Sequence, residues 1–236
     1  MRFLIGLVLG AFSLAGQQPR VLIIGDSISM GYTKPVQALL ADVADVQRIP
    51  ENGGPTINGL AHMEQWLATG KWDVIHFNFG LHDLKIMPDG KHQVEVEQYA
   101  ANLKVIVQRL QGTGAKLIWA TTTPVPAGKL TPQRIPGDVA IYNAAALPVM
   151  EANQIAIDDL YTFALPRLAE IQQPENVHYI EAGYEALAKQ VAASIRKWLP
   201  HSAAAAATRE TAPVNFRKES FSTLSNGSHS PSRQVE

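Results

Sequence analysis

The sequence predicts an α/β domain, in which a five-stranded parallel sheet carries helices on both faces and forms a three-layer α/β/α sandwich. Short apolar runs alternate five times with longer helical segments, a pattern typical of parallel strands joined by helices. The first short run, residues 21–24, is apolar at every position, which indicates a strand buried on both faces. The segments between the runs are long enough for the crossover helices that parallel strands require.

Five segments have the composition of strands. Residues 21–24 are mostly β-branched, and Gly25 ends the run. Residues 73–79 form a similar segment, which ends at Gly80. The other expected strands are the segments 46–49, 115–121 and 154–158. The residues that follow each strand lie at the carboxyl edge of the sheet, where open α/β sheets bind their ligands.

Helices are expected between these strands. Pro35 fits the first turn of a helix over residues 34–41, because its missing N–H would have no intrahelical acceptor there. Asn58 is expected to cap a helix that continues to residue 67, with apolar residues at i, i+3 and i+4 spacing. A long amphipathic helix is expected over residues 95–110. The remaining expected helices are 138–151, 160–168 and 181–198.

Composition restricts the classes of partner and of chemistry. The 236 residues are 46% hydrophobic and 17% charged with a net charge of −1, as in an ordinary globular protein, so a nucleic-acid partner is not expected. The chain has no cysteine, which excludes disulfides, thiolate metal sites and a catalytic thiol. The histidines His62, His76 and His92 are isolated and lack ligand spacing, so neither a metal site nor a cofactor is expected.

The two ends of the chain differ from the segment between them. Residues 1–16 combine a positive start, a short apolar run and small residues, the pattern of a secretory signal peptide. The run is too short for a stable membrane span, although an uncleaved anchor or a wrongly assigned start codon are alternatives. Residues 17–200 are expected to form the folded domain. Residues 201–236 are poor in apolar residues and are expected to be a disordered tail.

Two short motifs at opposite ends of the domain indicate chemistry. Gly25-Asp26-Ser27 follows the first strand, where Ser27 is either a nucleophile presented by a turn or merely part of a turn or helix cap. The second motif, Glu175-Asn176-Val177-His178, is followed closely by Glu181-Ala182-Gly183-Tyr184. An acyl transfer to serine needs a base to take the hydroxyl proton and a third group to orient that base.

With these motifs the chain resembles the GDSL-type SGNH hydrolases, which are serine esterases and lipases of flavodoxin-like three-layer α/β fold. The resemblance covers roughly residues 20–199 and implies Ser27 as nucleophile and His178 as base. In that family an aspartate three residues before the histidine orients it, and here this position holds Glu175. Alternatively Glu175 is a solvated loop carboxylate, in which case Asp158, Asp159 or no residue orients His178.

The resemblance also implies an oxyanion hole with three donors. They are the backbone N–H of Ser27, the backbone N–H of Gly54 (with Gly53 as the alternative) and a side chain from a Gly-x-Asn-Asp motif. That motif reads Gly80-Leu81-His82-Asp83 here, so His82 stands where asparagine is expected. A neutral imidazole still offers one N–H, so His82 is a candidate donor, with Asp83 supporting the loop. Alternatively His82 is structural and the site is crippled.

The expected function is that of a secreted or periplasmic serine hydrolase. It would cleave O-acyl esters with short acyl groups, including acetyl groups on carbohydrate, through Ser27, His178 and Glu175 by way of a covalent acyl-enzyme. The expected partner is therefore a small-molecule or carbohydrate ester. Two alternatives stay open: a non-catalytic protein that binds a glycan or small ligand, and an O-acyltransferase in which an alcohol replaces water.

Overall fold

The computed structural model describes residues 17–200; the predicted signal peptide and the predicted tail lie outside the described residues. Five parallel strands form one sheet in the order β2-β1-β3-β4-β5, the flavodoxin-like order, so the predicted fold class is confirmed. The strands are β1 (Arg20–Ile24), β2 (Asp45–Arg48), β3 (Val74–Phe77), β4 (Lys116–Ala120) and β5 (Ala156–Asp158).

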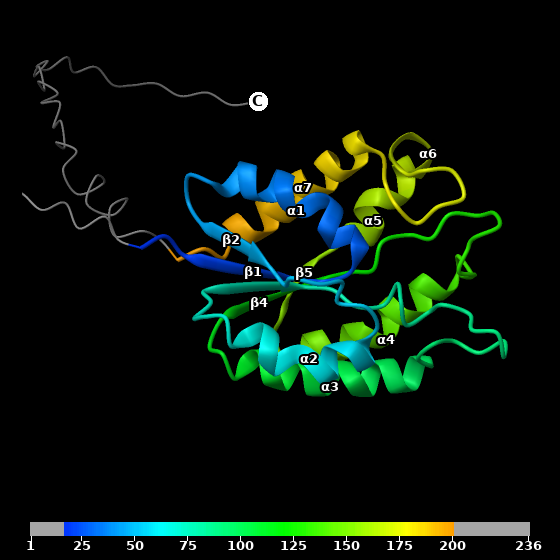
Figure 1. Cartoon of the computed structure of the whole chain (residues 1–236), viewed down its shortest axis with the longest axis horizontal. Coiled ribbons are helices and arrows are strands. Elements are labelled where there is room, and N and C mark those ends of the chain that lie inside the picture. Colours follow the sequence, from blue (N-terminus) through cyan, green and yellow to red (C-terminus); the bar gives the residue numbers. More distant parts are fainter. Residues whose placement is uncertain (1–16, 201–236) are drawn as a thin grey trace, which may run out of the picture. The chain divides into compact units, whose positions relative to one another are not determined.

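Helices cover both faces of the sheet (Figure 1). α1 packs with α7 on one face, and α3 packs with both α2 and α4 on the other. The helical segments are α1 (Ser27–Leu40), α2 (Thr56–Leu67), α3 (Val96–Gln111), α4 (Asp138–Ala152), α5 (Leu160–Ala164), the 3-10 helix η1 (Leu165–Arg167), α6 (Leu168–Ile171) and α7 (Glu181–Arg196). Within residues 17–200 we find no helix with the length and apolar character needed to cross a bilayer.

The core lies between the sheet and these two helical layers. The apolar stripe of α3 that faces the sheet is fully buried, and comprises Tyr99, Leu103, Ile106, Val107 and Leu110. Trp66 and Trp119 are the largest of the fully buried side chains. Burial of one aliphatic or aromatic side chain contributes about 1.5–3 kcal/mol, so these layers hold the strand ends, and the loops that follow them, in fixed positions.

Two helices begin earlier than predicted. α1 begins at Ser27, because the Asp26 carboxylate accepts the Ile28 N–H at 2.9 Å and caps the helix there; Pro35 then lies inside the helix. α2 begins at Thr56, whose N–H donates to the Asp83 carboxylate at 2.9 Å. The predicted cap at Asn58 was therefore wrong, because a carboxylate that is distant in sequence performs the capping.

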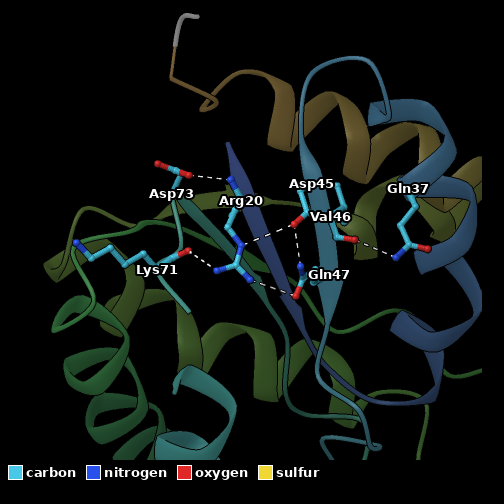
Figure 2. Close-up of polar contacts among 7 residues, drawn as sticks. All are labelled: Arg20, Gln37, Asp45, Val46, Gln47, Lys71 and Asp73. Carbon is cyan, nitrogen blue, oxygen red and sulfur yellow. Dashed lines mark hydrogen bonds and ion pairs between the residues drawn. The ribbon is translucent and has the colours of Figure 1, made fainter. Parts of the chain in front are cut away.

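Arg20 joins three segments at the amino edge of the sheet (Figure 2). Ser27 follows the opposite end of the same strand, β1. Its backbone N–H donates to the Asp73 carboxylate at 2.7 Å, and its guanidinium donates to the Lys71 carbonyl and the Gln47 side chain, both at 3.3 Å. The guanidinium also lies 3.7 Å from the Asp45 carboxylate. These contacts tie β1 to β2 and to the segment before β3.

Candidate active site

The site lies where β1 and β3 end. In a sheet of this order the chain connections leave these two adjacent strands in opposite directions, and a crevice opens beyond their carboxyl ends. Ser27 follows β1, and the segment that contains His82 follows β3. The fold thus brings two of the predicted site segments to one edge.

Ser27 is the first residue of α1 and is half-buried. Its backbone N–H has no intrahelical acceptor, because the first N–H groups of a helix have none. The positive end of the helix dipole also lies here, which stabilises negative charge on nearby oxygen. Serine in this position can therefore offer both a hydroxyl and a backbone donor.

Arg48, at the end of β2, clamps the serine turn. Its guanidinium donates to the Gly25 carbonyl at 2.9 Å and to the Ser29 hydroxyl at 3.2 Å. It also donates to the carbonyls of Ile49 at 2.6 Å and Glu51 at 2.9 Å. This role of Arg48 could not be predicted from the sequence, because nothing local to β2 indicates which distant carbonyls its guanidinium meets.

The structure places the Ser27 hydroxyl oxygen 2.9 Å from His178 Nε2, across 151 residues of sequence. His178 lies in the loop that precedes α7, and the Ile180 N–H donates to the Ile171 carbonyl at 3.0 Å to hold that loop on α6. A hydroxyl donating to an imidazole nitrogen at this distance is the arrangement of a nucleophile and its base.

Asn176 orients the His178 ring. Its side-chain oxygen accepts the His178 backbone N–H at 3.0 Å and lies 2.8 Å from His178 Nδ1. Its amide nitrogen donates to Gln173 Oε1 at 3.1 Å. These two contacts define which end of the amide is oxygen, so Nδ1 carries the ring proton and Nε2 is left as the acceptor for Ser27.

Glu175 does not occupy the predicted orienting position. Its backbone φ is +49°, its exposed side chain lies beside Gly128, and the partner of His178 Nδ1 is Asn176 instead. Asn176, two residues before His178, therefore makes the contact that was expected from Glu175, three residues before it. An asparagine that bonds the N–H two residues on is a common turn, and Asn176-Val177-His178 is a sequence signal for it.

The alternative acids lie elsewhere. Asp158 accepts from His76 Nε2 at 3.0 Å and from the Gln190 side chain at 2.9 Å, all within the buried face under α7. Asp159 caps α5 by accepting the Thr162 N–H at 3.0 Å. Neither carboxylate contacts His178.

The glycine loop before α2 lies against the serine turn. The Gly53 N–H donates to the Gly25 carbonyl at 3.0 Å, and a Cβ at Gly53 would lie 2.9 Å from that oxygen, so only glycine allows this approach. Gly54 has φ +63°, and its N–H donates to the Asn52 side chain at 2.9 Å. Both predicted glycine donors are therefore engaged within the chain rather than directed at a substrate.

His82 is half-buried, and its Nδ1 lies 2.9 Å from the Lys85 ammonium nitrogen. Burial is the main cause that lowers the pKa of His82 to about 4; the neighbouring Lys85, Arg134 and His178 act in the same direction, and Asp26 acts against them. The ring is therefore neutral at physiological pH. Leu81, which precedes His82 in the sequence, lines a small hollow together with Asp26 and Ile28, so this segment lies beside the serine turn.

Asp83 helps to hold the segment that carries His82 in place, which is the supporting role expected from the sequence. It is fully buried, and one of its oxygens accepts from both the backbone N–H and the hydroxyl of Thr56. Asn102 donates to the same hydroxyl at 2.9 Å, and Arg134 donates to the Leu81 carbonyl at 2.8 Å. These bonds fix the segment that carries His82 to α2, α3 and the 127–137 loop.

Burial raises the pKa of the Asp83 carboxyl to about 7, against the lowering effect of the Thr56 hydrogen bonds. Because the folded pKa lies above the unfolded value of 3.8, Asp83 binds its proton more tightly in the folded state, and its contribution to stability is lost as pH rises through about 7. Asp83→Asn removes this titration. We expect the free energy of unfolding of the wild type, relative to the variant, to fall by roughly 3–4 kcal/mol between about pH 4 and pH 8.

Urea denaturation of both proteins at several pH values measures this difference. The other titrating groups are common to both proteins and cancel. A difference between the two proteins that does not change with pH would show that Asp83 does not titrate in this range.

Other histidines pair with carboxylates. His76 is buried against Asp158, and His92 lies 2.7 Å from Asp138 and 3.2 Å from Glu95. Across the described residues 17–200, no group of three or more histidine, cysteine, aspartate or glutamate side chains is arranged so that it could hold a metal ion.

Solved structures with similar folds are acyl hydrolases and esterases. A lipase/acylhydrolase from Enterococcus faecalis has a TM-score of 0.67 and 22% identity, over 78% of this chain and 98% of its own. The acetylxylan esterase Axe2 from Geobacillus stearothermophilus has a TM-score of 0.64 and 20% identity, over 79% and 98%. The acetyl xylan esterase AlAXEase has a TM-score of 0.64 and 18% identity, over 75% and 99%. At these identities the likeness establishes the fold.

The family follows from the sequence match. A search of the curated proteins gave no match. Residues 23–186, more than half of the chain, match the GDSL-like lipase/acylhydrolase family, and this segment includes Ser27, His82 and His178. The chain therefore belongs to the GDSL-like lipase/acylhydrolase family and is a serine carboxylic ester hydrolase.

Proposed function

We propose that the enzyme cleaves O-acyl esters with Ser27 as nucleophile and His178 as general base. The observation that carries this assignment is the 2.9 Å separation of the Ser27 hydroxyl from His178 Nε2. His178 takes the hydroxyl proton on Nε2 while the serine oxygen bonds to the ester carbon, and the carbonyl oxygen becomes an oxyanion. The intermediate collapses by breaking the bond to the alcohol oxygen, which receives the proton from Nε2 and leaves an acyl-serine.

Deacylation repeats these steps with water. Water loses a proton to His178 Nε2 as its oxygen bonds to the acyl carbon. The bond to the Ser27 oxygen then breaks, this oxygen takes the proton back, and the carboxylic acid is released. An acceptor alcohol in place of water would make the same intermediate an acyl donor, so the products formed with added alcohol distinguish a hydrolase from a transferase.

Asn176 is the third member of the catalytic group in this proposal. Its side-chain oxygen lies 2.8 Å from Nδ1 and keeps the ring proton there, but it is neutral. A hydrogen bond to a charged group is worth roughly 1 kcal/mol more than one between neutral groups. An amide therefore stabilises the imidazolium less than a carboxylate would. We infer that kcat/KM is lower with asparagine at this position than it would be with aspartate.

Changing Asn176 to aspartate is accordingly expected to raise kcat/KM about fivefold, because the added charge stabilises the imidazolium that forms in the transition state. Asn176→Leu should lower kcat/KM by roughly 10- to 100-fold, because nothing then selects the Nδ1–H tautomer. Glu175→Gln is the matched control in the same loop and should leave kcat/KM within about twofold. Steady-state kinetics and melting temperatures of the three variants check this.

If Glu175→Gln lowered the rate while Asn176→Leu did not, the original assignment of Glu175 as the orienting acid would be correct, and the loop would rearrange on substrate binding.

We assign the oxyanion to two donors, the Ser27 backbone N–H and His82. The first is supported by the position of Ser27 at the start of α1, and the second by the neutral ring of His82 on a segment that lies beside the serine turn. Each donor of this kind is worth roughly 3–4 kcal/mol of transition-state stabilisation. Gly54 would join them only if its N–H left the Asn52 side chain.

Short acyl groups, including acetyl on carbohydrate, are the proposed substrates. Two of the similar solved structures are acetyl xylan esterases, which agrees with this choice. The signal-peptide pattern in residues 1–16 favours a site of action outside the cytoplasm.

Hydrolysis of p-nitrophenyl esters of increasing chain length, together with acetate release from acetylated xylo-oligosaccharides, tests this proposal. We expect kcat/KM to be highest for acetyl and to fall with each added pair of carbons. A maximum of kcat/KM at acyl chains of about eight carbons or longer would contradict the short-acyl assignment. It would not affect the assignment of the nucleophile.

A further inference from the structure

Lys85 lies one turn after His82 in the segment that follows β3. The Leu84 N–H donates to the Gly80 carbonyl at 3.0 Å, which closes the turn, and the Lys85 ammonium nitrogen comes to 2.9 Å from His82 Nδ1. An ammonium group has donors only, so the nitrogen that it meets must accept. Nδ1 is therefore the unprotonated nitrogen, and the single proton of the neutral ring lies on Nε2.

The other ring nitrogen is free for a ligand. Within residues 17–200, no hydrogen bond is made to His82 Nε2, and this atom is not among the buried polar atoms that lack a partner. It is therefore exposed to solvent. The side chains that act on the pKa of the ring are Lys85, Arg134, His178 and Asp26, which come from four different segments.

This arrangement matters because an imidazole differs from an amide. An asparagine side chain always has N–H donors, whichever way it is held. A neutral histidine has one N–H, and the tautomer determines which side of the ring can donate. A histidine used as an oxyanion donor therefore needs a neighbour that selects the tautomer, whereas an asparagine does not.

We infer that Lys85 is a positioning residue, which holds His82 in the Nε2–H tautomer so that its one N–H faces the open side of the site and can donate to the oxyanion. The inference rests on the proposed role of His82 for its effect on rate, but not for its effect on the tautomer. Lys85 itself need not contact the substrate.

The first test is the tautomer of His82, measured by ¹⁵N NMR of the histidine rings, with His82→Asn used to assign the signals. The wild type should show a protonated Nε2 and an unprotonated, hydrogen-bonded Nδ1. Lys85→Met should shift both nitrogens toward the values of a tautomer mixture, and Lys85→Arg should restore the wild-type pattern, because a guanidinium also has donors only. Lys91→Met, an exposed lysine of the neighbouring loop, is the matched control.

The second test is a double-mutant cycle in kcat/KM. Lys85→Met should lower kcat about tenfold in the wild-type background with little change in KM, because the oxyanion interaction is made only in the transition state. In a His82→Asn background the same change should alter kcat by less than about twofold, since an amide has no tautomer to select. If Lys85→Met acted through a general structural effect, it would lower kcat equally in both backgrounds.

The outcomes distinguish the effect of Lys85 on the tautomer of His82 from the effect of that tautomer on the rate. An unchanged His82 spectrum in Lys85→Met would overturn the positioning role, whatever the activity. A shifted spectrum with unchanged kcat would contradict the link between the tautomer and the rate. If His82→Ala were then also fully active, the failure would lie in the proposed oxyanion role of His82 and not in the contact with Lys85.

Discussion

Replacing Ser27 by alanine is expected to lower kcat/KM for ester hydrolysis by roughly 10⁴- to 10⁶-fold, the effect typical of losing a serine nucleophile. The hydroxyl that donates to His178 Nε2 is removed, so no acyl-enzyme can form. The fold should be unaffected, because the cap of α1 is the Asp26 side chain and not Ser27. Steady-state kinetics on p-nitrophenyl acetate, with the melting temperature as the control for folding, measure this effect.

Residual activity has a simple interpretation. If Ser27→Ala stayed within about tenfold of the wild type, hydrolysis would have to come from a general-base attack of water or from another residue. His178→Ala should match Ser27→Ala closely, because the two groups act as one unit and their losses do not add.

The second large effect is expected at His82. Removing the ring in His82→Ala should lower kcat by roughly 10²- to 10³-fold, the usual cost of losing one oxyanion donor. His82→Asn should keep most of the activity, because its amide N–H can donate in the same direction. The pKa of about 4 also means that His82 does not titrate between about pH 5 and pH 8, so rate changes in that range must come from other groups.

Equal kcat/KM for His82→Ala and the wild type would refute the donor assignment. Loss of activity in both His82→Ala and His82→Asn, with unchanged melting temperatures, would instead show that the imidazole does something an amide cannot, such as transferring a proton.

The fold could be predicted because its signals are local. Apolar runs such as 21–24 and the stripe of α3 determine strand and helix by their periodicity, whatever they later pack against. The start of α2 could not be predicted in this way. Its first N–H bonds to Asp83, which is 27 residues away, and no pattern around Thr56 indicates that partner.

In the candidate site, too, residues in local motifs could be predicted, and contacts between distant residues could not. Ser27 and His178 stand in compact motifs at the ends of strand and loop, so sequence alone was enough to propose them. The orienting residue was assigned by family spacing to Glu175, whereas in the folded loop that side chain lies beside Gly128 and Asn176 contacts the ring. Arg48 was missed because the carbonyls it binds come together only in the folded chain.

The central claim is that Ser27 is an activated nucleophile, and covalent labelling with a fluorophosphonate probe tests it most directly. Peptide mapping by mass spectrometry should find one probe per chain on the Ser27 oxygen, and both Ser27→Ala and His178→Ala should prevent labelling. Ser29, whose hydroxyl donates to the Asp26 carbonyl at 2.7 Å, should stay unmodified. No labelling of the folded wild type, or labelling at another residue, would contradict the account.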